Sequence, residues 1–179
     1  LWSSLIFLAV LVFAAVREMF FQDWRQIQRA VLRGLAPAEA AAFRVDLRQI
    51  VAPEVGAMDR CVSCHVGMAP GETGIRGDRL YGAHADVFHD PAEFGCTVCH
   101  GGQGRATSTA EAHGHVPYWS RPMLPAKYSY AGCGTCHAFA SIPPRDRLGA
   151  GEAIVEKQKC RSCHRMDHRE PAPEKAVAD

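Results

Sequence analysis

The chain has 179 residues, a formal net charge of +1 with neutral histidines, and 47% hydrophobic residues. A net charge this close to zero argues against the strongly basic surface that nucleic-acid binding needs, so we expect no nucleic-acid partner. Eight cysteines and nine histidines are the unusual part of the composition. The spacing of the cysteines carries most of the functional information in the sequence.

The N-terminal segment is apolar, and its first charged residue is Arg17. A run of sixteen uncharged residues is shorter than the roughly 20 that span a bilayer. Two interpretations therefore compete: a cleaved signal peptide and an uncleaved transmembrane anchor. No small-residue cleavage site followed by a loop ends the run, and Phe20, Phe21 and Trp24 suit the aromatic belt of a membrane interface. We expect residues 1–19 to form a single-pass transmembrane anchor in contact with membrane lipid.

Residues 20–52 are predicted to form a helical stalk or docking segment. Apolar residues recur there at intervals of three and four, the period of one helix face. Gly34 interrupts the pattern, and Pro37, a favoured first helical residue, starts a second helix that runs to about Gln49 and stops before Pro53. Two roles stay open: the segment docks on a partner subunit, or it packs as a stalk beneath the following domain. The apolar positions are Phe20, Trp24, Ile27, Val31, Leu32 and Leu35.

All eight cysteines fall into four copies of one pattern, Cys-x-x-Cys-His. This is the attachment signature of c-type haem, in which two cysteines form thioethers to the haem vinyl groups and the histidine ligates the iron. The alternative is zinc, because two Cys-x-x-Cys pairs can supply four thiolates, but it leaves every adjacent histidine unexplained. We therefore expect four covalently attached haem c groups. The copies are Cys61-Cys64-His65, Cys96-Cys99-His100, Cys133-Cys136-His137 and Cys160-Cys163-His164.

The second axial ligand of each iron sets the redox character of its haem. We predict His84 and His89 as distal ligands, and one of His113 and His115 as a third, with His113 preferred. For His84 and His89 the alternative is a surface histidine or one that binds a haem propionate. Spare histidines outnumber well-placed methionines, so we expect mostly bis-histidine ligation. The proximal histidines supplied by the motifs are His65, His100, His137 and His164.

The four motifs lie within residues 53–168, where we expect a small tetrahaem cytochrome c domain. Roughly 30 residues per haem are too few to build a protein core, so the haems should form much of the core. No strand alternation is sustained. The fold class is therefore predicted as mainly α with extensive loops: an N-terminal transmembrane helix plus a small multihaem cytochrome c domain. Residues 169–179 are predicted to be a disordered tail.

The layout resembles membrane-anchored multihaem c-type cytochromes of bacterial respiratory chains. One branch, the tetrahaem quinol dehydrogenases of nitrate and nitrite respiration, also has one N-terminal helix and four such motifs. The cytochrome subunits that accompany bc-type and other quinol-oxidising membrane complexes look closer, over about residues 24–137. The stretch that carries this similarity is FGCTVCHGGQGRAT at residues 94–107, followed by His113-Gly114.

The resemblance implies a bacterial cytoplasmic-membrane protein with its haem domain on the periplasmic side. Its partners would be integral membrane subunits of a respiratory or photosynthetic electron-transfer complex and a soluble redox protein. We expect an electron-transfer subunit without catalytic residues of its own, since no protein nucleophile or acid–base pair is evident. Two alternatives stay open: an autonomous quinol dehydrogenase, and a reductase with one open iron site.

Overall fold

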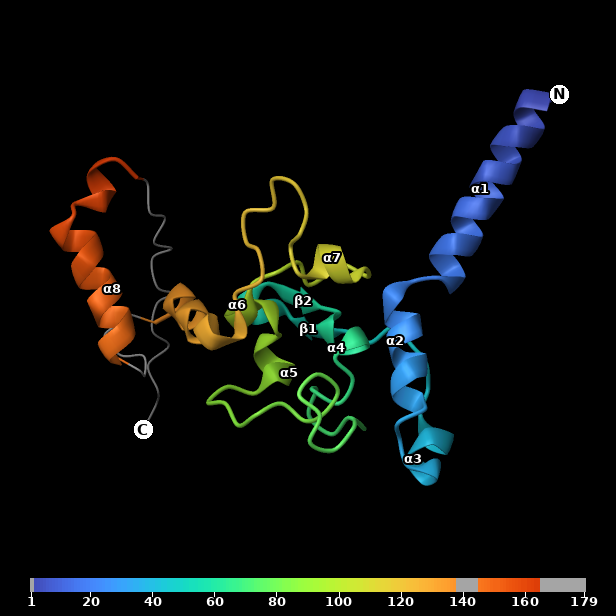
Figure 1. Cartoon of the computed structure of the whole chain (residues 1–179), viewed down its shortest axis with the longest axis horizontal. Coiled ribbons are helices and arrows are strands. Elements are labelled where there is room, and N and C mark those ends of the chain that lie inside the picture. Colours follow the sequence, from blue (N-terminus) through green and yellow to red (C-terminus); the bar gives the residue numbers. More distant parts are fainter. Residues whose placement is uncertain (1, 138–144, 165–179) are drawn as a thin grey trace. The chain divides into compact units, whose positions relative to one another are not determined.

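A computed structural model describes residues 2–137 and 145–164 of the chain (Figure 1). The predicted tail, residues 169–179, and the end of the predicted haem domain, residues 165–168, lie outside the described residues. The chain divides into two compact units. Unit 1 comprises Leu1–Thr97 and Gly102–Met123, and unit 2 comprises Val98–Gly101 and Leu124–Asp179. The boundary between the units therefore passes through the second Cys-x-x-Cys-His motif.

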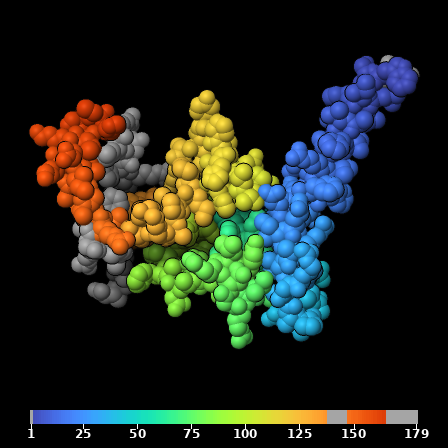
Figure 2. Space-filling model, viewed as in Figure 1, coloured from blue at the N-terminus to red at the C-terminus, as the bar shows by residue number. Residues whose placement is uncertain are grey.

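The first element of unit 1 is the apolar helix α1, Trp2–Phe20. Its 19 residues make a rod about 28 Å long, close to the hydrocarbon thickness of a bilayer. None of its residues is buried, and Figure 2 shows its side chains exposed along the helix. Within the described residues one helical stretch is long and apolar enough to cross a membrane, and α1 forms its apolar part. The helix is interrupted at Phe21 and Gln22 before α2 begins.

The predicted membrane anchor can be tested by cell fractionation. We expect the full chain to remain with membranes through a high-salt wash. The double substitution Leu8→Arg with Leu11→Arg should release it, because each arginine at the centre of a spanning helix costs about 2.5–3.5 kcal/mol. Glu18→Gln lies beyond the apolar run and is the matched control. Release of the unsubstituted chain by salt alone would contradict the prediction.

Helix α2, Asp23–Leu32, buries Trp24, Gln28 and Val31 on one face. This face lies against the short helix α4, Cys61–Cys64. Two of the predicted apolar positions, Trp24 and Val31, are thus buried within unit 1, where each contributes about 1.5–3 kcal/mol of hydrophobic stabilisation. The apolar period therefore brings α2 against the first Cys-x-x-Cys-His motif, while Phe20 and Phe21 stay exposed.

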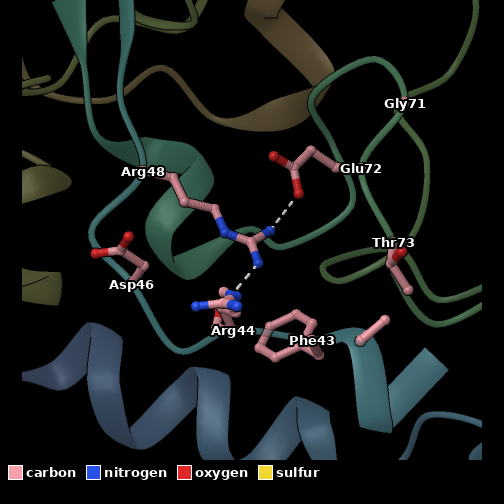
Figure 3. A pocket seen from close by; sticks show the side chains of 8 residues that line it. Phe43, Arg44, Asp46, Arg48, Gly71, Glu72 and Thr73 are labelled. Atoms are coloured by element: carbon pink, nitrogen blue, oxygen red, sulfur yellow. Dashed lines mark hydrogen bonds and ion pairs between the residues drawn. The ribbon is translucent and has the colours of Figure 1, made fainter. Parts of the chain in front are cut away.

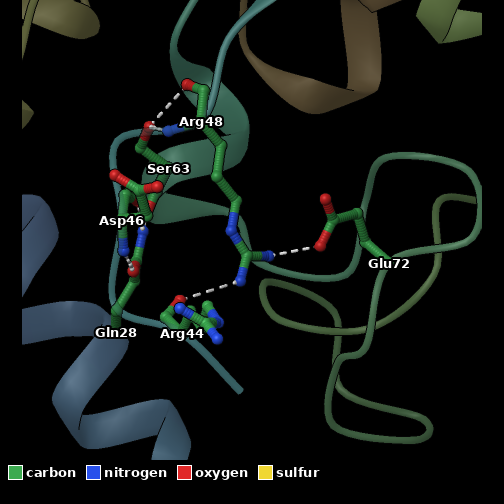
Figure 4. A network of polar contacts seen from close by, with 6 residues as sticks. All are labelled: Gln28, Arg44, Asp46, Arg48, Ser63 and Glu72. Atoms are coloured by element: carbon green, nitrogen blue, oxygen red, sulfur yellow. Dashed lines mark hydrogen bonds and ion pairs between the residues drawn. The ribbon is translucent and has the colours of Figure 1, made fainter. Parts of the chain in front are cut away.

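Helix α3, Pro37–Ala42, is much shorter than predicted. It starts at Pro37 as expected, but the prediction that it continues to about Gln49 is wrong. The backbone of Asp46 is held by the Gln28 amide, which accepts from its N–H at 2.9 Å and donates to its carbonyl at 2.7 Å. The Ser63 hydroxyl likewise accepts from the Arg48 N–H and donates to the Arg48 carbonyl (Figure 4). Side chains from α2 and α4 thus replace the helical hydrogen bonds and hold the segment extended.

A two-stranded hairpin follows, which the sequence reasoning did not foresee. Strand β1, Ile50–Ala52, pairs antiparallel with β2, Ala57–Asp59, in the register Ile50 to Asp59. The 3₁₀ turn η1, Pro53–Val55, and Gly56 at φ 67° connect the strands. Three-residue strands are too short to show a sustained alternation. The hairpin ends at Asp59, two residues before the first cysteine, Cys61.

The remaining elements are short helices and loops, which agrees with the predicted mainly α fold with extensive loops. Unit 1 adds α5, Pro91–Phe94, which lies against β1, and α7, Thr109–Ala112. Helix α6, Thr97–His100, spans the boundary between the units. In unit 2 the described elements are η2, Ala126–Thr135, α8, Arg145–Lys157, and η4, Cys160–Ser162.

Candidate functional site

The first motif is built on α4. Cys61 and Cys64 are one helical turn apart, so their side chains share a face, and His65 caps the helix at its C-terminal end. All three are half-buried. The His65 Nδ1 lies 3.3 Å from the Leu80 carbonyl oxygen. When Nδ1 donates its proton to a carbonyl, Nε2 keeps its lone pair for a metal. This contact therefore favours the tautomer of His65 that an axial ligand requires.

The structure brings His113 near this histidine. The two ring centres are 6.3 Å apart, and the ring planes differ by 27°. An imidazole nitrogen sits about 2 Å from the metal it ligates and about 1.1 Å from its own ring centre, so two histidines that ligate one iron from its two sides would have centres about 6.2 Å apart. The spacing of His65 and His113 fits a bis-histidine haem. Of the two predicted candidates, His115 is exposed and His113 is half-buried.

The environment of His113 favours its neutral form. Burial lowers the pKa of His113 below its usual value, and the neighbouring His65 and His115 lower it further. Metal ligation needs the neutral imidazole. His113 follows directly on α7, where its N–H donates to the Thr109 carbonyl at 3.1 Å. Its carbonyl accepts from Met123 at 3.0 Å. Hydrogen bonds to its N–H and to its carbonyl thus hold the backbone of His113 in place.

The other two predicted distal ligands line one open cavity. His84, half-buried, and His89, exposed, both border a hollow of about 330 Å³. Met68 also lines it. The His89 ring lies 4.4 Å from the ring of Phe94. Apolar side chains in the same loop are exposed, and they offer the kind of surface that a porphyrin face covers. They are Leu80, Val87 and Phe88, with exposed fractions of 53%, 53% and 96%.

The second motif is joined to the first within unit 1. The Cys96 thiol hydrogen-bonds to the Cys61 sulfur and lowers the pKa of the Cys61 thiol, while burial and the Asp59 carboxylate act in the opposite direction. Burial raises the pKa of the Cys64 thiol to about 11. The first cysteines of the first two motifs thus touch one another.

The third motif meets the second half of the second motif within unit 2. Burial raises the pKa of the Cys99 thiol, and the nearby Cys133 and Cys136 raise it further. Gly132 lies against the Cys99 backbone so closely that an added Cβ would collide with it. His100 is half-buried, whereas His137 is exposed. The carbonyl of His100 accepts from the Leu124 N–H at 2.7 Å.

The fourth motif lies on η4 at the end of α8. Cys160 is half-buried, and Cys163 and His164 are exposed. Lys159 turns the chain into the motif at φ 53°. An ion pair between Arg161 and Glu156, at 2.7 Å, links this turn to α8. Across the described residues, 2–137 and 145–164, no three His, Cys, Asp or Glu side chains converge on one metal position.

One cavity was missed by the sequence reasoning. It encloses about 370 Å³ between the segment after α3 and the loop at residues 71–73 (Figure 3). Arg48 pairs with the Glu72 carboxylate and donates to the Arg44 carbonyl at 3.3 Å. Its guanidinium lies 4.8 Å from the centre of the Phe43 ring. Charges alternating at Arg44, Asp46 and Arg48 were the available signal, but a helix was expected there.

Comparison with known proteins adds no assignment, because no protein-family model matches the chain and no solved structure matches it.

Proposed function

We propose that this protein is an electron-transfer subunit that carries four covalently attached c-type haems outside the cytoplasm, anchored by α1 in a bacterial cytoplasmic membrane. Its electrons would come from quinol-oxidising membrane subunits of a respiratory or photosynthetic complex and pass to a soluble acceptor on the periplasmic side. The haem groups supply the redox chemistry. The chain attaches them, ligates their irons and sets their surroundings.

The observation that carries the proposal is the joining of consecutive motifs. Cys61 and Cys96 touch within unit 1. Cys99 lies beside Cys133 and Cys136 within unit 2. Residues of the first and second motifs thus lie together within unit 1, and residues of the second and third motifs lie together within unit 2, which supports a relay between neighbouring haems. The histidine pair at 6.3 Å further supports an electron carrier, because an iron with both axial positions filled has no open site for substrate.

The test of the proposal is the number of covalent cofactors. We expect denaturing mass analysis of the protein, matured in a host that attaches c-type haem, to show the chain plus four haem masses. Each Cys→Ser pair, beginning with Cys61 and Cys64 together, should remove one haem mass. A chain that carries no haem, or carries zinc instead, would overturn the proposal.

A relay subunit is favoured over an autonomous quinol dehydrogenase because the apolar face of α2 is used internally against α4. What stays exposed near the membrane is α1 with Phe20 and Phe21, which suits contact with lipid and with other membrane subunits. We expect the isolated holoprotein to be reduced slowly by quinol and rapidly once the membrane partner is added. Fast, inhibitor-sensitive reduction of the isolated chain would favour the dehydrogenase.

A further inference from the structure

Asp59 is a fully buried carboxylic acid located between two haem-attachment motifs. It ends β2, its exposed fraction is 0%, and it precedes Cys61 by two residues. A carboxylate is rarely buried unless hydrogen bonds or a charge partner compensate for lost hydration. The compensation at Asp59 comes from the second motif.

Three donors of that motif bind the Asp59 carboxylate. Oδ2 accepts from the N–H of Cys96 at 2.5 Å and from the N–H of Thr97 at 2.8 Å. Oδ1 accepts from the Thr97 hydroxyl at 2.7 Å. These are neutral donors, so they stabilise the negative charge of the carboxylate without cancelling it. Asp59 thereby caps the first residue of α6, as acidic side chains do at helix N-termini.

The chain on either side of the second motif is shaped around this carboxylate. Gly95 adopts φ +73°, and a Cβ there would lie 2.5 Å from Oδ2. A Cβ on Gly104 would collide with Oδ1. Arg60 donates its N–H to the Gly104 carbonyl and its Nη1 to the Arg105 carbonyl, both at 2.7 Å. Hydrogen bonds thus hold the start of the second motif to Asp59 and the segment after the motif to Arg60.

We propose that Asp59 is a positioning residue shared by the first two haems, which holds the Cys61 and Cys96 attachment points in contact and, as a buried negative charge beside both, lowers the reduction potentials of these two haems. This inference rests on the proposed function, because it presupposes attached haems. A ferric haem carries one more positive charge than a ferrous haem, so a nearby buried anion stabilises the ferric state. Water would screen the same charge at the surface.

The test is a redox titration of the full holoprotein with Asp59→Asn, followed by visible absorption. Asparagine keeps the shape and one acceptor oxygen but removes the charge. We expect two of the four haem components to shift to higher potential, with low-spin spectra and four haem masses retained. Asp46→Asn removes an exposed carboxylate of unit 1 and is the matched control, which should shift none of them. No shift in Asp59→Asn, or an equal shift of all four components, would overturn the inference.

If the Asp59→Asn protein does not mature with its haems attached, a second variant tests the inference. Thr97→Val removes the hydroxyl donor and keeps the carboxylate, leaving its charge less compensated. Two components should then shift to lower potential, opposite in sign to Asp59→Asn. An upward shift or none would overturn the inference. An unsubstituted chain without covalent haem would instead refute the proposed function, so the two failures are distinguishable by mass analysis alone.

Discussion

Replacing His113 by alanine is expected to convert one of the four haems from low spin to high spin. The His113 ring stands 6.3 Å from that of His65, the separation of two histidines on one iron. Alanine leaves no ligating group on that side, so the iron becomes five-coordinate. A high-spin ferric signal in electron paramagnetic resonance and new carbon monoxide binding by one haem would measure the change. The number of covalent haems should stay at four, because the attaching cysteines are untouched.

His115→Ala is the matched control. His115 is two residues away and exposed, and its ring centre lies 6.2 Å from that of His113. We expect its spectrum to equal that of the unsubstituted protein. If His115→Ala produces the high-spin haem and His113→Ala does not, the assignment of the two histidines is reversed. The predicted ligands His84 and His89 can be tested by the same measurement.

Gly104→Ala is expected to cause a large structural loss in unit 1. The new Cβ would collide with the Asp59 carboxylate and lie 2.7 Å from the Met58 carbonyl oxygen. Overpacking typically costs about 1–3 kcal/mol, and displacement of the carboxylate would also break hydrogen bonds to the second motif. We expect a strongly reduced yield of mature tetrahaem protein and a lower midpoint of thermal unfolding, followed by circular dichroism.

Gly149→Ala provides the comparison at a glycine without neighbours. Gly149 lies within α8, and nothing stands within 4 Å of its added Cβ. Alanine there should be neutral or stabilising by roughly 0.5–1 kcal/mol, because glycine loses more backbone entropy in a helix. Equal losses in both variants would mean that the contact between Gly104 and Asp59 does not hold the second motif.

The sequence by itself determined the features that depend on local spacing. The uncharged N-terminal run predicted a helix able to span a membrane, and α1 is such a helix. Apolar residues recurring every three and four positions, among them Trp24 and Val31, marked one face of a helix, and α2 buries both of these residues. The prediction of four covalent haems also rests on spacing, because Cys-x-x-Cys-His places all attaching groups within five residues, and it stays a prediction.

Only the tertiary structure decided which of these local features meet. The helix expected up to Gln49 stops at Ala42 because Gln28 and Ser63, distant in sequence, take the backbone groups of Asp46 and Arg48. His113 lies near His65 although 48 positions of chain separate them, and no short-range pattern links them. Asp59 looked like an ordinary acidic residue, yet it is buried because the Cys96–Thr97 backbone closes over it. Such pairings depend on hydrogen bonds and burial between distant segments, which residue type and spacing along the chain do not encode.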